Sequence, residues 1–132
     1  MIADTEAISA LVERYLGHFH AANFGAAFEC YRMPFTWVFD SHAYSVASRE
    51  AFMEMMQKSK AGLAKQGLAE SRLVDIAVQP RSEHVALASL IVDRLRLDGT
   101  VLERTSGTYL VHNDRSGWRL AGYWSDPNGA AP

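Results

Sequence analysis

The first part of the chain carries hydrophobic residues at the spacing of one helical face. They follow one another at alternating steps of three residues and one residue: Ile8, Leu11, Val12, Tyr15, Leu16 and Phe19. A helix places residues three and four apart on the same side, so the pattern predicts an amphipathic helix over residues 5–22. At 1.5 Å per residue its length would be about 27 Å. A short second helix is expected over residues 26–31, before Pro34.

Two short strands and a third helix are expected next. Residues 35–39 are rich in aromatic and β-branched side chains, which favour a strand. A turn at 40–42 would lead to a return strand at 44–47. Ser48 is a suitable N-cap for the following helix, and Gly67 would end it. The buried stripe of this helix would consist of Phe52, Met55, Met56 and Leu63.

From residue 68 onward the pattern changes to that of long strands, expected over residues 73–79, 84–97 and 118–125. The dipeptide Asp98-Gly99 predicts a two-residue hairpin turn. In that register Asp93 faces Arg104. Its neighbour Arg94 then faces Glu103. Two pairs of opposite charge support the hairpin, and as solvated cross-strand pairs each would contribute about a few tenths of a kcal/mol.

The element order is helix, helix, strand pair, helix and then a meander of antiparallel strands. Helices gathered at one end of an antiparallel sheet make an α+β fold. We expect a single domain over residues 1–132, with a core of about residues 5–125 and a loose tail at 126–132. A strongly curved sheet around the first helix would leave a cone-shaped pocket between them, which suits a small apolar molecule.

The strand expected at 84–97 is apolar on both faces in its middle, except for Ser89. A strand buried on both faces needs cover on both. The helices would cover one face and another subunit the other, so we expect a homodimer through the convex face of the sheet. The apolar residues expected on that convex face are Leu87, Ile91, Leu110 and Leu120.

The composition excludes several classes of function. Of the 132 residues, 48% are hydrophobic and 21% charged, as in an ordinary globular protein. The net charge is −2 and the basic residues are scattered, which argues against a nucleic-acid or membrane surface. A single cysteine, Cys30, excludes an internal disulfide. The sequence shows neither an apolar run of about 18 residues nor a signal-peptide pattern, so the cytoplasm is the expected compartment.

The histidines do not follow a metal-binding pattern. They are His18, His20, His42, His84 and His112. On a helix, His18 and His20 would point about 200° apart, and the others show no short ligand spacing. We therefore expect no metal. His42, two residues after Asp40, is a candidate partner of that carboxylate, and the alternative is an ordinary turn histidine.

Five local stretches carry a family resemblance: Val12–Leu16, Tyr31, Asp40, Ser48–Phe52 and Gly117–Leu120. With the element order, they resemble the nuclear transport factor 2-like superfamily over about residues 5–125. That superfamily includes ketosteroid isomerases, polyketide cyclases of the SnoaL type, dehydratases and ligand-binding members. The resemblance implies a cystatin-like α+β cone, in which a curved antiparallel or mixed sheet wraps around the long first helix. Members share this scaffold and differ in chemistry.

The ketosteroid isomerases in this superfamily offer a chemical comparison. They use an Asp after the first strand as general base and a Tyr on the first helix as oxyanion donor. The resemblance assigns these roles to Asp40 and Tyr15, and it makes Tyr31 a hydrogen-bonding partner of Tyr15. The chain departs from the pattern at two positions, because a second acid would fall near Gly107 and a further Tyr near Met56.

Aromatic residues of the last strands are candidate pocket residues. If position 107 faces the cavity, Tyr109 and Tyr123 share that face, while Trp124 lies on the other. A bulge in the turn at 113–117 would exchange Tyr123 and Trp124. The alternative is that these three aromatic side chains cover a dimer interface.

An apolar wall is what a base at Asp40 would need, because such a wall raises the pKa of a carboxyl group toward working pH. Trp37, Phe39 and the methionines of the third helix could supply it. The alternative for Asp40 is a turn residue that bonds its own backbone. Together with the catalytic candidates Asp40, Tyr15 and His42, the candidate substrate-binding residues are Tyr31, Trp37, Met56, Tyr109 and Tyr123.

Three functions stay open at this point. The first is an isomerase, cyclase or dehydratase without metal or organic cofactor, acting on a small apolar oxygenated substrate. In it, Asp40 would move a proton next to a carbonyl group and Tyr15 would stabilise the oxyanion. The second is a non-catalytic ligand-binding module with the same pocket. The third is a structural dimer whose cone is filled by its own side chains.

Overall fold

The computed structural model describes residues 5–39 and 41–126. Within these ranges the helices are α1 (Thr5–His20), α2 (Phe24–Phe28) and α3 (Arg49–Lys65). The strands are β1 (Phe35–Val38), β2 (Ala43–Val46), β3 (Glu70–Pro80), β4 (Val85–Leu95), β5 (Val101–Asp114) and β6 (Gly117–Ser125). No helix in the described part is long and apolar enough to span a bilayer.

Local signals in the sequence set the ends of α3. The Ser48 hydroxyl accepts a hydrogen bond from the Ala51 backbone N–H at 3.1 Å, which satisfies one of the free N–H groups at the helix start. After the helix, Gly67 adopts a φ of +97°, a conformation that glycine reaches without strain. Both predicted ends of this helix are therefore confirmed.

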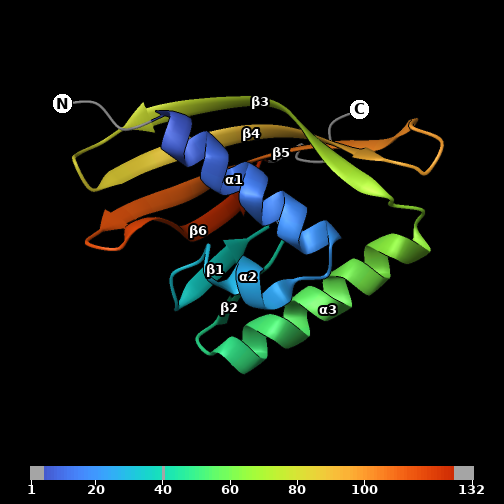
Figure 1. The fold of residues 1–132 in the computed structure, drawn as a ribbon, viewed down its shortest axis with the longest axis horizontal. Helices are drawn as coiled ribbons and strands as arrows, with labels where there is room; N and C mark the ends of the chain where they lie inside the picture. Colours follow the sequence, from blue (N-terminus) through green and yellow to red (C-terminus); the bar gives the residue numbers. More distant parts are fainter. Residues whose placement is uncertain (1–4, 40, 127–132) are drawn as a thin grey trace.

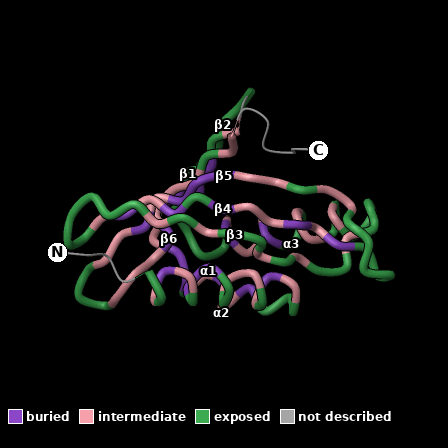
Figure 2. Tube along the Cα trace, turned by 90° about the horizontal axis from the view of Figure 1, so that it is seen from above, coloured by how far each residue is buried: buried purple, intermediate pink, exposed green. Residues whose placement is uncertain are grey.

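The six strands form one curved, unclosed sheet in the order β2-β1-β6-β5-β4-β3. The β1–β6 pair is parallel and the other pairs are antiparallel, so the predicted α+β fold with a mixed sheet is confirmed. Helix α1 crosses the sheet, and α3 lies below it in the same view (Figure 1). Seen from above, α1 and α2 lie on one side of β3, β4 and β5 (Figure 2).

The core lies between α1 and the concave side of the sheet. The predicted stripe of α1 supplies Ile8, Leu11 and Val12, each at most 1% exposed. Phe35 of β1 and Phe52 of α3 are also fully buried. The α1 stripe and these rings belong to one buried hydrophobic cluster, and the apolar area they bury contributes roughly 25 cal/mol per Å². The helix is thereby fixed on the sheet and can form one wall of a site.

The β4–β5 hairpin has the predicted register but not the predicted turn. Both expected charge pairs face each other across the two strands. The Arg96 N–H donates to the Thr100 carbonyl at 2.8 Å, so the loop holds three residues, 97–99, and the two-residue prediction is wrong. Leu102 has no partner on β4 and acts as a bulge. One extra residue in β5 offsets the extra residue in the loop and restores the register.

A second bulge, in β6, corrects the expected place of Leu120. The register between β5 and β6 shifts at Ala121, which has no partner on β5. Leu120 and Tyr123 therefore face the same concave side although they lie three residues apart. Leu120 is fully buried there, so its predicted position on the convex face is wrong. Trp124 faces the convex side and is 40% exposed.

The Asp93–Arg104 pair is not the solvated surface pair that the sequence predicts. The Asp93 side chain is 1% exposed and accepts hydrogen bonds from Arg104 Nε at 2.7 Å and from Arg72 Nη2 at 3.1 Å. Two guanidinium groups, from β3 and β5, thus cover this carboxylate on the convex side. Chiefly through the Arg104 hydrogen bonds, they lower the pKa of Asp93 to about 2.

Candidate functional site

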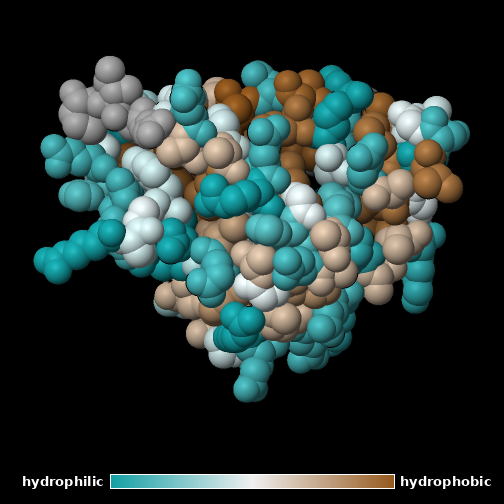
Figure 3. Space-filling model, viewed as in Figure 1, coloured by the Kyte–Doolittle hydropathy of each residue, from teal (hydrophilic) through white to brown (hydrophobic). Residues whose placement is uncertain are grey.

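A cavity of about 380 Å³ lies between α1, α3 and the concave side of the sheet. This size falls within the range of small-molecule sites, roughly 300–1,000 Å³. Its apolar lining consists of Val12, Leu16, Phe19, Trp37, Phe39, Met55, Met56, Leu63, Leu90 and Val92. Apolar surface is visible between the polar side chains on this side of the molecule (Figure 3). The cone is therefore not filled by its own side chains.

Tyr15 brings the first of several phenol groups into this cavity. Its hydroxyl donates to the Met56 sulfur at 3.8 Å, and a thioether is a weak acceptor. The hydroxyl can therefore exchange this contact for a stronger acceptor on a ligand. Burial raises the pKa of Tyr15 to about 12, so at neutral pH the phenol keeps its proton and remains a donor.

Tyr31 does not line the cavity but lies behind Tyr15. Its ring meets that of Tyr15 edge-on, with 5.2 Å between centroids, and the residue is 5% exposed. Within the described residues the Tyr31 hydroxyl makes no hydrogen bond of good geometry, but it interacts with the hydroxyls of Tyr15 and Tyr109. Burial raises the pKa of Tyr31 well above its usual value, and the neighbouring Tyr109 and Tyr15 add to this effect. Tyr31 thus supports the phenol at the cavity wall from behind.

The structure brings four of the five predicted substrate-binding residues to the cavity: Trp37, Met56, Tyr109 and Tyr123. Trp37 is 6% exposed and stacks on Tyr44, with 5.5 Å between ring centroids. Tyr44 lines the cavity as well, although the sequence argument did not single it out. Its place follows from the β1–β2 pairing, in which Trp37 faces Tyr44.

The two remaining catalytic candidates come from the β1–β2 turn. Asp40 lies outside the described residues. His42 is exposed and does not line the cavity. Its ring packs on Phe39 and Tyr44, at centroid distances of 5.2 and 6.2 Å. Both of these neighbours line the cavity, so His42 contacts the cavity wall from outside.

Tyr123 lies over Gly107, at the position where the family pattern would place an acid. A Cβ atom at position 107 would lie only 2.7 Å from Tyr123 Cε1 and still closer to its hydroxyl. Real Cβ atoms do not approach carbon so closely, so only glycine leaves room for this ring. A phenol from β6 therefore fills the space of the missing side chain on β5. The Tyr123 ring also packs on Tyr109, at 4.8 Å.

Arg94 is a cavity residue that the sequence argument missed. Its predicted partner is correct, since Nη1 donates to Glu103 Oε1 at 2.7 Å. However, the side chain is only 30% exposed, and it lines the cavity beside Val92. Burial raises the pKa values of Tyr15, Tyr109 and Tyr123, and the charge of Arg94 acts in the opposite direction on all three.

Neither a metal site nor a reactive cysteine is found in the described part of the chain. Among residues 5–39 and 41–126, no group of three His, Cys, Asp or Glu side chains is placed to hold a metal ion. Cys30 is buried, and its thiol donates to the Ala26 carbonyl at 3.8 Å. Burial raises the pKa of this thiol, which leaves less of the nucleophilic thiolate at neutral pH.

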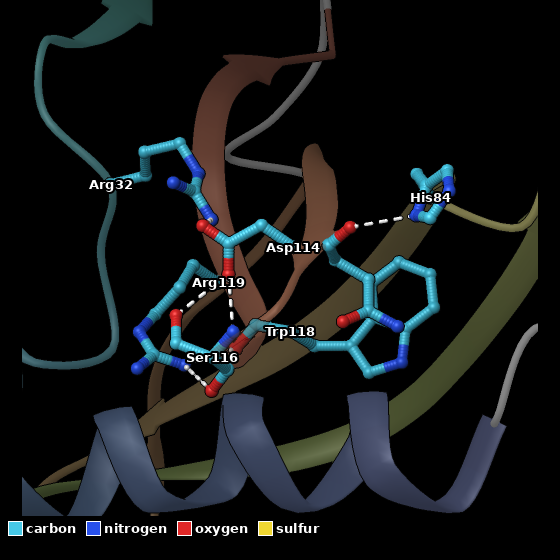
Figure 4. A network of polar contacts seen from close by, with 7 residues as sticks. Arg32, His84, Asp114, Ser116, Trp118 and Arg119 are labelled. Atoms are coloured by element: carbon cyan, nitrogen blue, oxygen red, sulfur yellow. Dashed lines mark hydrogen bonds and ion pairs between the residues drawn. The ribbon is translucent and has the colours of Figure 1, made fainter.

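A polar network at the β5–β6 turn has a structural role (Figure 4). The Asp114 carboxylate pairs with Arg32 at 2.6 Å and accepts hydrogen bonds from the Ser116 hydroxyl and N–H. The Ser116 hydrogen bonds and the contact with Arg32 lower the pKa of Asp114. Arg32 follows α2, so the network ties that segment to the turn. None of these residues lines the cavity.

Comparisons with known proteins agree on the fold. A family model described as NTF2-like protein (DUF6841) matches residues 4–128. No curated protein matches the sequence.

Several solved structures are similar at low sequence identity. An NTF2-like protein with a cystatin-like fold from Novosphingobium aromaticivorans has a TM-score of 0.72 at 18% identity, over 92% of this chain and 80% of that one. An NTF-2 like protein of unknown function from Shewanella oneidensis has a TM-score of 0.72 at 17% identity, over 93% and 98%. A ketosteroid isomerase-like protein from Erwinia carotovora atroseptica has a TM-score of 0.68 at 15% identity, over 95% and 96%. Identities this low establish a shared fold and no shared activity.

Proposed function

The chain belongs to the NTF2-like protein family DUF6841. From this premise we propose that its cavity binds a small apolar molecule with a carbonyl group. We propose further that the site moves a proton at the carbon next to that group. The observation that carries the proposal is the cavity itself, whose apolar wall is interrupted by phenol groups on one side. Such a wall shields a ligand from water and leaves oriented donors for its oxygen.

Tyr15 is the donor that we assign to the ligand oxygen. Its weak contact with the Met56 sulfur at 3.8 Å is easily exchanged for a hydrogen bond to a carbonyl group. With a pKa of about 12, the phenol donates a proton in a hydrogen bond without losing it at neutral pH. This is the property that stabilisation of an enolate oxygen requires.

Asp40 is the base that we assign to the reaction. Its neighbour in the sequence, Phe39, lines the cavity. In the proposed step the carboxylate takes a proton from the carbon next to the carbonyl. The electrons of the broken C–H bond move to the oxygen, which becomes an enolate held by Tyr15. Return of the proton to the same or another carbon completes an isomerisation.

The test uses 2-acetylnaphthalene, an apolar ketone with exchangeable methyl protons. We expect it to quench the tryptophan fluorescence on binding, since Trp37 lines the cavity, and we expect the protein to catalyse exchange of the methyl protons in D₂O. Asp40→Asn should keep the binding and slow the exchange by about 10²–10⁴-fold, as for loss of a general base. Equal exchange by the wild type and the variant would overturn the assignment of Asp40.

A binding module without chemistry is the second candidate, and the open cavity alone favours it. Binding of 2-acetylnaphthalene by the wild type without catalysed exchange would select this candidate. If the ketone neither changes the fluorescence nor raises the melting temperature, both candidates fail. Ser59→Ala is a matched control for exchange, because its hydroxyl also lines the cavity but contacts the Met55 sulfur at 3.7 Å.

We further propose that two copies associate through the convex side of the sheet. Trp124 is 40% exposed there and Val38, its partner in the β1–β6 register, is 44% exposed. Leu87 and Leu110 face each other on the same side. Light scattering should give the mass of a dimer, and Leu110→Glu should give the monomer, because it places a charge in this patch. A monomeric wild type at high concentration would refute the dimer.

A further inference from the structure

The cavity carries a guanidinium group that the proposed reaction does not use. Arg94 belongs to β4, whose even-numbered residues face the concave side, and it lines the cavity with Leu90 and Val92. Across the neighbouring strands it faces Ser71 of β3 and Glu103 of β5. The sheet therefore holds the charge at a fixed place in the wall.

Arg94 keeps most of its hydrogen-bonding capacity. The guanidinium has five N–H donors, and within the described residues its side chain makes one hydrogen bond, from Nη1 to Glu103 Oε1 at 2.7 Å. Glu103 itself does not line the cavity. One edge of the planar group is thus fixed by Glu103, and the remaining N–H groups are available for a second partner.

The electrostatic surroundings of Arg94 favour an anion. No described Asp or Glu side chain lines the cavity. The other charged lining residue is Lys58, whose side chain is 76% exposed and pairs with Glu54 at 2.9 Å. The charge of Arg94 opposes the rise in the pKa values of Tyr15 and Tyr109. All three side chains line the cavity, so a ligand there can meet both guanidinium and hydroxyl donors.

From this arrangement we propose that the ligand of the cavity carries a carboxylate, which Arg94 binds while an apolar body fills the space along α1 and α3. This inference rests on the proposed function and names the chemical class of its ligand, a small apolar oxo acid that carries a carboxylate in addition to the reacting carbonyl group. A carboxylate accepts two parallel hydrogen bonds from a guanidinium group. Because the Arg94 side chain is 30% exposed, added salt would screen this pair.

The experiment compares 2-naphthoate with 2-naphthamide, which has the same shape and no charge. Both are titrated against the protein by isothermal titration calorimetry. We expect the wild type to bind the carboxylate about ten- to hundredfold more tightly, the range for a hydrogen bond to a charged group. Arg94→Gln should remove this preference and leave the affinity for the amide unchanged. Arg81→Gln, a change of the same charge at an exposed loop position, should leave the preference intact.

Glu103→Gln provides a test in the opposite direction. This variant removes the carboxylate that neutralises Arg94, so 2-naphthoate should bind more tightly than to the wild type. A merely structural role of Arg94 predicts no such gain. In the wild type, added salt should weaken binding of the carboxylate and leave the amide unaffected, which keeps the proposal testable even if Arg94→Gln fails to fold.

Equal affinities for 2-naphthoate and 2-naphthamide in the wild type would overturn this inference. A preference that survives in Arg94→Gln would overturn it as well. These outcomes leave the proposed function standing, provided that 2-acetylnaphthalene still binds. Loss of binding for all three naphthalene compounds would instead contradict the proposed function, so the two failures are distinguishable.

Discussion

The ring of Tyr123 occupies the space that a side chain at position 107 would need. A Cβ atom on Gly107 would meet the hydroxyl, Cζ and Cε1 atoms of this ring at distances that real contacts do not show. The relationship couples two neighbouring strands, because the identity of a β5 residue decides where a β6 phenol points. It also means that Tyr123, and not position 107, supplies the polar group at this part of the cavity.

Gly107→Ala should therefore move Tyr123 and change the cavity. We expect a loss of about 1–3 kcal/mol in the free energy of unfolding, the usual range for overpacking, measured by urea denaturation. Gly17→Ala is the control, since a Cβ at this helical position has open space and alanine favours a helix by up to about 1 kcal/mol. A Gly107→Ala variant as stable as the wild type would show that the ring moves without cost.

Tyr31→Phe should be neutral or stabilising at pH 7. The Tyr31 hydroxyl is buried without a well-formed hydrogen bond in the described part of the chain, although it interacts with the hydroxyls of Tyr15 and Tyr109. An unsatisfied buried hydroxyl costs about 1–3 kcal/mol. Removing it leaves the ring contacts with Tyr15, Phe35 and Phe52 in place. Urea denaturation measures the effect. A loss of more than about 1 kcal/mol would show that the hydroxyl makes a good hydrogen bond.

The buried phenols predict a loss of stability in alkali. The pKa of Tyr15 is about 12 and that of Tyr31 is raised well above 10. Because the folded state favours the protonated form, this contribution is fully present below pH 10 and is lost as pH rises through 10 toward 12 and beyond. Urea denaturation between pH 8 and 12 should show the decline, and Tyr15→Phe should make it shallower. Tyr44→Phe, at a half-exposed position, should alter it less.

Asp93 predicts the opposite behaviour in acid. Its pKa of about 2 lies below the ordinary value of 3.8, so its contribution to stability is present above about pH 4 and is lost as pH falls toward 2. Asp93→Asn should lower the free energy of unfolding at pH 7 and flatten its decline between pH 4 and 2. Glu83→Gln, an exposed change between β3 and β4, is the control. Equal acid profiles for Asp93→Asn and the wild type would contradict the buried pair.

The elements and the pairing of consecutive strands were predictable because their signals are local, whereas the parallel β1–β6 pair joins strands far apart in the chain. The α1 stripe, the Ser48 cap and the charge pairs of the β4–β5 hairpin each lie within a short stretch of sequence. Bulges are different, because one unpaired residue leaves no mark in the alternation of apolar and polar positions. The sequence therefore misplaced Leu120, whose orientation depends on the unpaired Ala121.

The candidate site was predictable only in part for a related reason. Tyr15 and Tyr123 could be placed at the cavity from the helix stripe and the family resemblance, and Trp37 from the apolar wall that a base at Asp40 would need. The pairing of Arg94 with Glu103 could also be predicted, but as a solvated pair. Whether such a pair faces water or a cavity depends on what covers that side of the sheet. Here α1 and α3 cover it, and no feature of β4 alone shows this.

The burial of Leu120 gives a direct test of the β6 bulge. Leu120 is fully buried, so Leu120→Ala should cost about 2–5 kcal/mol of unfolding free energy, the range for large-to-small changes in a core. Leu97, in the three-residue hairpin loop, is 94% exposed, so Leu97→Ala should stay within about 0.5 kcal/mol of the wild type. Urea denaturation of both variants at neutral pH measures the difference. Equal small effects would place Leu120 on the convex side and contradict the bulge at Ala121, which puts Leu120 and Tyr123 on the same face.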